Sequence, residues 1–148
     1  MSTASNISGT EKRAIASLAS LYALRMLGLF MVLPVMAVAG ADFEGATPEL
    51  LGLAIGAYGL SQALLQIPAG ALSDYFGRKP IIVAGLLIFA LGSFIAANAD
   101  TIYGIILGRF LQGCGAIASA VMALVSDLTR EEHRMKAMAS IGASIGLS

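Results

Sequence analysis

Long apolar stretches alternate with short polar segments along this chain. Four of the stretches are long enough to cross a hydrocarbon core of about 30 Å, which takes about 20 residues of helix. None of them alternates between apolar and polar residues with period two, as a membrane β-strand would. We therefore predict an all-α integral membrane protein whose complete transmembrane helices cover about residues 14–39, 48–72, 80–99 and 102–125.

A fifth apolar stretch begins near Met135 and continues to Ser148. From Ala137 onward its 12 residues make about 18 Å of helix, which is shorter than the hydrocarbon core. We expect residues 135–148 to be the start of a fifth helix in a fragment of a longer protein. The predicted layout is a cytoplasmic tail over residues 1–13, followed by a partial transmembrane helical bundle over residues 14–148.

Lysine and arginine residues mark one side of this predicted bundle. Seven of the nine basic residues flank the predicted helices on that side. The charged residues of the two loops expected on the other side are all acidic. Since short cytoplasmic loops carry the excess of Lys and Arg, we predict a cytoplasmic N-terminus. The seven residues are Lys12, Arg13, Arg78, Lys79, Arg130, Arg134 and Lys136.

The composition excludes most other classes of protein. Hydrophobic residues make up 57% of the 148 residues and charged residues 12%, which is more hydrocarbon than a soluble domain of this size can bury. The sequence has no basic face with interleaved aromatic residues, so we predict no nucleic-acid partner. It also has no metal-ligand spacing, no nucleophile beside a base and no phosphate-binding loop, so we predict neither an enzyme nor a cofactor or metal site.

Two arginines, Arg25 and Arg109, fall inside predicted helices. A lone arginine at the bilayer centre costs about 2.5 kcal/mol or more, so each should face a protein interior or a wet cavity. For Arg25 we favour a cavity-lining role over structural pairing. For Arg109 we favour a role in substrate binding or proton coupling, the alternative being a bond to Gln112 or to backbone.

Polar side chains also recur along the second predicted helix. Tyr58, Gln62 and Gln66 are spaced four residues apart and therefore share one face of that helix. This stripe either lines a translocation path or bonds to neighbouring helices, and the sequence does not favour one over the other.

Glycine pairs spaced four residues apart occur in three predicted helices. This spacing lets helix backbones approach closely, so we predict a packing role for them. The pairs are Gly52 and Gly56, Gly104 and Gly108, and Gly142 and Gly146.

The turn between the second and third helices has unusual chemistry. Asp74 is predicted at the C-terminal end of a helix, where the helix dipole disfavours an anion, and Arg78 is the nearest compensating charge. Gly77 suits a turn position with positive φ, and Gly70 leaves room for a neighbouring helix. A plain turn that sets the topology would explain the same residues equally well.

Two segments resemble the signatures of the major facilitator superfamily. The string GALSDYFGRKPII matches its loop signature at Gly70, Leu72, Asp74, Gly77, Arg78 and Lys79, and departs from it at Tyr75, where the family usually has a basic residue. The string ILGRFLQGCGA resembles the family's second signature, around Arg109, Gln112, Gly113 and Gly115.

The resemblance implies a twelve-helix secondary transporter of the drug:proton antiporter type in the cell inner membrane. Its partners would be the lipid bilayer, a small-molecule substrate, protons and the remaining helices of the transporter. In this family an aspartate and an arginine of the loop form a charge network with a further aspartate at the end of helix four, and Asp74, Arg78 and Asp127 occupy those places.

A similarity between two segments of the sequence is consistent with this charge network acting as a conformational switch. The strings ALSD and ALVSD bring two carboxylates to the same predicted membrane face, which is consistent with a proton-sensitive device or with two ordinary interfacial acids. For the chain as a whole, the alternative to a transporter is a small oligomeric membrane scaffold that does not transport.

Overall fold

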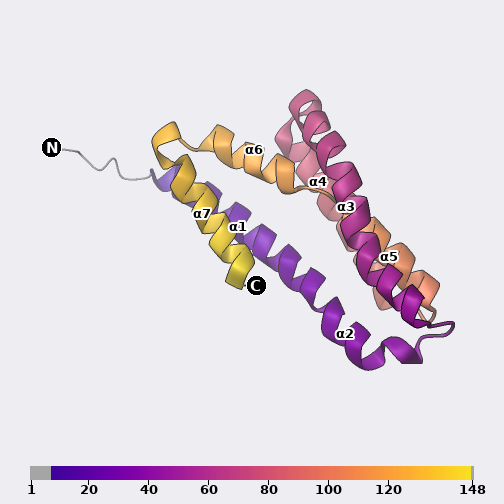
Figure 1. Ribbon diagram of the computed structural model, residues 1–148. Helices are drawn as coiled ribbons and strands as arrows, with labels where there is room; N and C mark the ends of the chain where they lie inside the picture. The colour runs from indigo at the N-terminus through magenta and orange to yellow at the C-terminus, as the bar shows by residue number, and fades with distance from the viewer. Residues whose placement is uncertain (1–7, 148) are drawn as a thin grey trace. The chain divides into compact units, whose positions relative to one another are not determined.

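The computed structural model describes residues 8–147, and those residues fold almost entirely as helices (Figure 1). In chain order the elements are α1 (Gly9–Phe30), α2 (Val32–Ala39), the 3-10 helix η1 (Gly40–Asp42), α3 (Pro48–Phe76), α4 (Arg78–Ala97), α5 (Ile102–Cys114), α6 (Ala118–Leu128) and α7 (Glu131–Leu147). Within these residues the only β-type pairing is an isolated bridge between Glu44 and Thr101.

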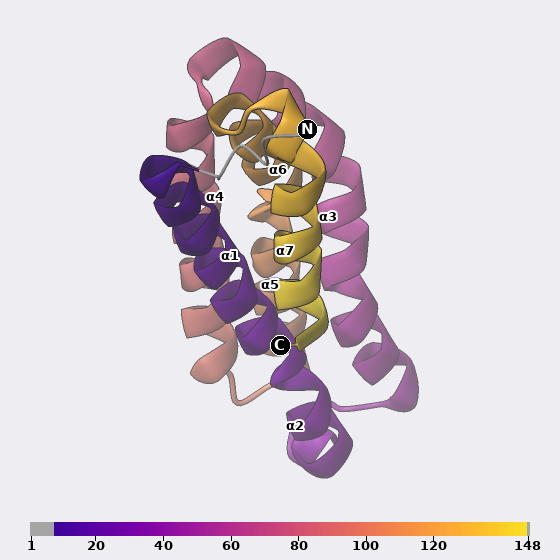
Figure 2. The same ribbon diagram turned by 90° about the vertical axis from the view of Figure 1, so that its left-hand side faces the viewer.

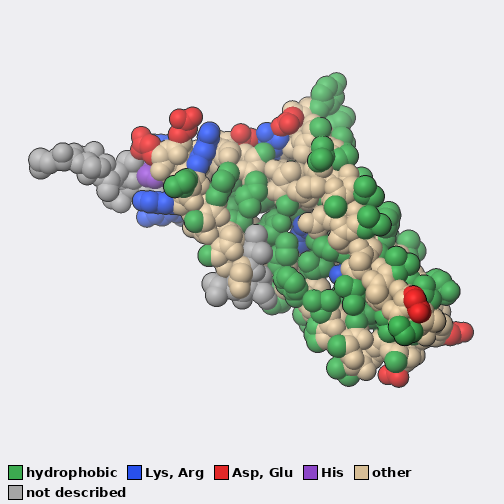
Figure 3. Space-filling model, in the orientation of Figure 1, with side chains coloured by type: hydrophobic (Ala, Val, Ile, Leu, Met, Phe, Trp, Pro, Cys, Tyr) green, Lys and Arg blue, Asp and Glu red, His purple; other side chains and the backbone are tan. Residues whose placement is uncertain are grey.

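Four helical segments are long and apolar enough to cross a membrane, as predicted. They are Gly9–Asp42, Pro48–Phe76, Arg78–Ala97 and Ile102–Leu128. Large hydrophobic side chains on these segments are exposed, for example Val38 at 85% and Ile67 at 81%. Hydrophobic side chains cover much of the face seen in Figure 3, as expected for helices solvated by lipid.

The chain divides into two compact units, each described separately below. The terminal unit comprises Met1–Phe30 and Met122–Ser148, and the central unit comprises Met31–Val121.

In the central unit, α5 packs against both α3 and α4. Two side-chain caps fix where helices begin. The Thr47 hydroxyl accepts a hydrogen bond from the Leu50 N–H, with Pro48 as the first residue of α3, and the Thr101 hydroxyl accepts one from the Gly104 N–H at the start of α5. An apolar cluster near these two starts includes Met36, Ala54, Ile102 and Ile105.

Glycine allows the closest approach between α4 and α5. A Cβ atom on Gly92 would lie 2.6 Å from the backbone nitrogen of Gln112 and 2.6 Å from the carbonyl oxygen of Gly108. The predicted packing role therefore applies to Gly108. For Gly52, Gly56, Gly142 and Gly146 it stays a prediction, because a Cβ there would meet nothing within 4 Å among the described residues.

The structure places several helix boundaries differently from the approximate ranges expected from the sequence. The first span breaks at Met31, because Pro34 has no N–H to donate to the carbonyl of Phe30. The fourth span breaks over residues 115–117. The third helix begins at Arg78 rather than at Pro80, and the fifth begins at Glu131 rather than at Met135.

In the terminal unit, α1 and α7 lie side by side with their N-terminal ends together (Figures 1 and 2). Glu11 joins these two ends. Its carboxylate accepts a hydrogen bond from the Ser8 N–H at 2.8 Å, and its other oxygen accepts one from the Arg130 N–H at 3.2 Å. Because Arg130 directly precedes α7, one buried carboxylate satisfies backbone donors at the start of both helices.

Candidate functional site

The turn between α3 and α4 is a single residue, Gly77. Its φ of 98° lies in the region that side chains other than glycine rarely adopt, so glycine is needed for α4 to begin directly after α3. This short connection holds the last turn of α3 and the first turn of α4 against each other.

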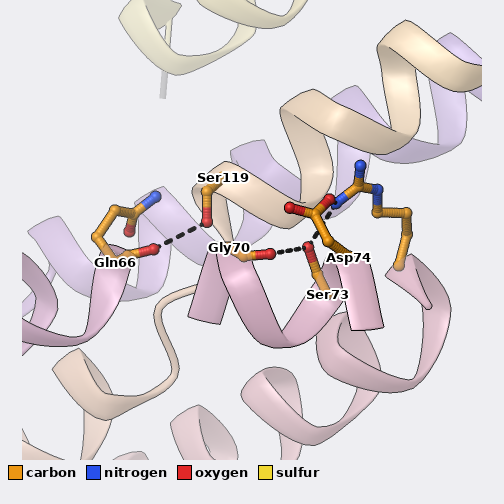
Figure 4. A network of polar contacts seen from close by, with 6 residues as sticks. Gln66, Gly70, Ser73, Asp74 and Ser119 are labelled. Atoms are coloured by element: carbon orange, nitrogen blue, oxygen red, sulfur yellow. Dashed lines mark hydrogen bonds and ion pairs between the residues drawn. The ribbon is translucent and has the colours of Figure 1, made fainter. Parts of the chain in front are cut away.

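Charged and hydroxyl groups form a connected network at this turn (Figure 4). Arg78 is ion-paired with Asp74, and its Nη1 atom also donates to the Ser73 hydroxyl at 2.8 Å. That hydroxyl donates in turn to the carbonyl oxygen of Gly70 at 2.7 Å. The Asp74 side chain is 67% exposed whereas Ser73 is 1% exposed, so the network runs from an exposed carboxylate to a buried backbone carbonyl.

The start of α6 packs onto the same stretch of α3. The Ser119 hydroxyl donates to the carbonyl oxygen of Gln66 at 3.1 Å (Figure 4), and a Cβ on Gly70 would lie 3.2 Å from that hydroxyl oxygen. Gly70 therefore gives α6 the room that the sequence predicted. Neither Ser73 nor Ser119 was predicted, because serine is common on helices and its partners here come from the fold.

The predicted charge network also includes Lys79 and Asp127. Lys79 is exposed on the first turn of α4. Asp127 is exposed near the end of α6 and belongs to the terminal unit, so its part in the network stays a prediction.

Within the membrane-spanning part of the central unit, Arg109 is 3% exposed. Its Nη1 donates to the side-chain oxygen of Gln112 at 2.9 Å, and its guanidinium carbon lies 5.0 Å from the centre of the Tyr58 ring. The Gln112 amide nitrogen donates to the Ser93 hydroxyl at 2.9 Å. A buried cation is thus held by neutral groups from three helices, α3, α4 and α5.

The polar stripe of α3 lines a shallow pocket beside this arginine. The pocket has a volume of about 300 Å³, and Tyr58, Gln62, Gln66 and Ala118 are among its lining residues. The amide oxygens of Gln62 and Gln66 are buried and accept no hydrogen bond from any described residue. They are therefore available to a ligand that donates hydrogen bonds.

The other predicted membrane arginine, Arg25, is also 3% exposed, but it lies on α1 in the terminal unit. The structure brings Tyr58, Gln112 and Arg109 together in the central unit and places Arg25 in a different unit. The predicted cavity-lining role of Arg25 stays a prediction.

Comparison with known proteins identifies the family. The profile described as Major Facilitator Superfamily matches residues 18–148. The chain belongs to this superfamily of membrane transporters. The match covers both signature segments described above.

Similar individual proteins are also transport proteins by name. The chain is 62% identical over 138 residues to the inner membrane transport protein YajR of Escherichia coli K12, covering 93% of the chain and 30% of that protein. It is 47% identical over 138 residues to the uncharacterized transporter BU466 of Buchnera aphidicola, covering 93% of the chain and 35% of that protein. It is 39% identical over 113 residues to the multidrug resistance protein MdtH of Yersinia enterocolitica, covering 75% of the chain and 28% of that protein. The chain thus spans about a third of the length of these relatives.

Proposed function

We propose that this chain supplies the first helices of a secondary transporter that exports a small amphipathic molecule in exchange for protons. Transport would occur by alternating access, with one helix bundle rocking against the other around a site near the membrane midplane. Membership of the superfamily supports transport over a scaffold role. The name of the multidrug resistance relative MdtH supports export of small molecules.

The observation that carries this proposal is the polar pocket on α3. Unpaired amide oxygens are costly among apolar helices, so a ligand that bonds to Gln62 and Gln66 recovers that cost. Tyr58 lines the pocket, and the positive charge of Arg109 lies 5.0 Å from the centre of the Tyr58 ring. Such a pocket suits a molecule with an apolar body and a few hydrogen-bond donors.

The network at the turn supplies a means of biasing the conformational equilibrium. Asp74 is mostly exposed and is ion-paired to Arg78, so protonation of the carboxylate would remove the charge that holds the arginine. Ser73 and Gly70 would transmit a movement of Arg78 to the last turn of α3. In this proposal the network, with Asp127 as its third charge, stabilises one of the two access states.

The proposed orientation places the N-terminus and this turn in the cytoplasm, in the inner membrane. The support is the distribution of basic residues, which lie before α1, at the turn between α3 and α4, and around the start of α7. The name of the Escherichia coli relative agrees with an inner membrane location.

The test is transport by the full-length protein in proteoliposomes. A panel of fluorescent amphipathic compounds is loaded, a proton gradient is imposed, and the flux of each compound is measured. We expect gradient-dependent flux of at least one compound, and at least a tenfold loss of that flux in Gln62→Leu. The control is Gly56→Ala, because a Cβ at Gly56 meets nothing within 4 Å among the described residues.

Two results would count against the proposal in different ways. Flux that does not depend on the proton gradient would overturn the proposed proton coupling but not the proposed transport. Wild-type flux in both Gln62→Leu and Gln66→Leu would show that this pocket is not on the substrate path.

A further inference from the structure

A groove in the terminal unit runs between α1 and α7, and it shares no lining residue with the polar pocket of α3. Its volume is about 290 Å³, and its lining includes Lys12, Ile15 and Ala19 from α1, with Lys136 and Ala137 from α7. All of these residues belong to the same compact unit, in which α1 and α7 pack directly on each other (Figure 2).

The groove changes from charged to mostly apolar along its length, with Ser140 as a polar residue on the α7 side. Both lysines lie near the N-terminal ends of their helices, and those ends are adjacent. From Lys12 to Ala19 the α1 side descends about 10 Å, at about 1.5 Å per residue, and its residues become apolar. Ala19 and Ala137 are buried at the floor, whereas both lysines are exposed at the mouth.

Three carboxylates lie near this mouth; Glu11 and Glu131 have other partners, and Glu132 lies one turn before Lys136 on α7. Glu11 accepts hydrogen bonds from the Ser8 and Arg130 backbone, and Glu131 pairs with Arg134 at 3.8 Å. Among the residues that the structure describes, no carboxylate is ion-paired with Lys12 or Lys136. The mouth of the groove therefore carries two ammonium groups near the N-terminal ends of α1 and α7.

We propose that this groove binds an anionic phospholipid, with its phosphate between Lys12 and Lys136 and the beginning of an acyl chain on the apolar floor. Ammonium groups of lysine bind phosphate as point charges, which needs no fixed fork geometry. Basic pockets between transmembrane helices on the cytoplasmic side are suited to anionic headgroups. The apolar floor favours a lipid over a free phosphate ion, because a free ion would gain nothing from Ile15, Ala19 and Ala137.

The experiment is native mass spectrometry of the purified full-length protein in detergent, titrated with phosphatidylglycerol. The variant is Lys12→Gln with Lys136→Gln. Each lysine near an anionic headgroup is worth about a fivefold change in affinity, so we expect roughly 25-fold weaker binding in the double variant. Lys12→Arg with Lys136→Arg should keep wild-type affinity within about threefold, because both charges remain.

Matched controls separate this site from general attraction to the basic face. Lys79→Gln removes an exposed lysine of the central unit and should leave the titration unchanged. Ala16→Leu fills the groove without changing charge and should weaken binding. Phosphatidylcholine with the same acyl chains should bind at least tenfold more weakly than phosphatidylglycerol.

Three results would overturn the proposal. The first is wild-type phosphatidylglycerol affinity in the double glutamine variant. The second is an equal loss of affinity in Lys79→Gln. The third is displacement of the lipid by millimolar inorganic phosphate, which would show a site for a free anion. The readout is lipid affinity, so its outcome is independent of whether the transport proposal holds.

Discussion

At the scale of single residues, the central finding is that a buried arginine is held by uncharged partners. Gln112 links Arg109 to Ser93, and the Tyr58 ring covers the guanidinium. The sequence already indicated that Arg109 should face a protein interior or a wet cavity, because a lone arginine inside the membrane is costly. It could not identify Ser93, which lies 19 positions away from Gln112 and reaches it only through the packing of α4 on α5.

Gln112→Leu tests whether this support stabilises the protein. Removing the acceptor leaves the Arg109 Nη1 donor unpaired among apolar groups, so we expect a loss of about 2 kcal/mol in the free energy of unfolding. The measurement is unfolding of the full-length protein in mixed detergent micelles. The matched control is Gln62→Leu, whose amide oxygen has no partner among the described residues and which should leave stability nearly unchanged. Equal losses in the two variants would contradict this account of Arg109.

Gly92→Ala tests the close approach of α4 and α5. The added Cβ would lie 2.6 Å from two backbone atoms that cannot move independently, so we expect destabilisation of about 1–3 kcal/mol. Gly56→Ala should be almost neutral, although Gly56 belongs to a glycine pair that the sequence marked for packing. Melting temperatures of the two purified variants check this, and a lower melting temperature for Gly56→Ala than for Gly92→Ala would refute it.

At the scale of helices, the long elements were predictable and their interruptions were not. Apolar length indicated four spans, and the predicted start of the second span at residue 48 agrees with the start of α3. The break at residues 115–117 lies in an apolar stretch with no proline, and α4 packs closely against it. A Cβ on Gly115 would clash with the carbonyl oxygen of Gly85 and would lie 3.1 Å from the Cβ of Phe89.

The start of the fifth helix was misplaced for a related reason. Residues 131–134 are polar and precede the apolar stretch from which the helix was predicted. Glu131 and Glu132 nevertheless suit the first turn of a helix, where the dipole favours acidic residues. Glu11, 119 positions away from Arg130, adds an acceptor at that end. A contact between such distant residues cannot be predicted from local sequence.

Glu11→Gln tests the contact between the starts of α1 and α7. A neutral amide accepts a weaker hydrogen bond than a carboxylate, so the Arg130 N–H should exchange with solvent roughly fivefold faster. Hydrogen exchange followed by mass spectrometry of peptides spanning Arg130 measures this change. Glu131→Gln is the control, because its side chain is 90% exposed and its contact with Arg134 is long. Unchanged exchange in Glu11→Gln would show that the contact does not hold the two ends together.

At the scale of the whole molecule, the chain combines membrane-spanning helices with the signatures of a transporter superfamily. It belongs to the Major Facilitator Superfamily and spans about a third of the length of its curated relatives. The Asp74, Arg78 and Ser73 network lies at a one-residue turn between two spanning helices, where a change in charge can alter how the helix ends are held. The sequence indicated the ion pair through spacing, whereas the hydrogen bond from Ser73 to Gly70 required the structure.

The central claim is that the carboxylate of Asp74 couples protons to transport. The most direct test is the flux that a proton gradient drives through the full-length Asp74→Asn variant in proteoliposomes, compared with the wild type. The control variant is Asp42→Asn, because Asp42 is exposed and is the last residue of the span Gly9–Asp42. We predict at least a tenfold loss of gradient-driven flux in Asp74→Asn, normal membrane insertion, and wild-type flux in Asp42→Asn. Wild-type gradient-driven flux in Asp74→Asn would contradict the account.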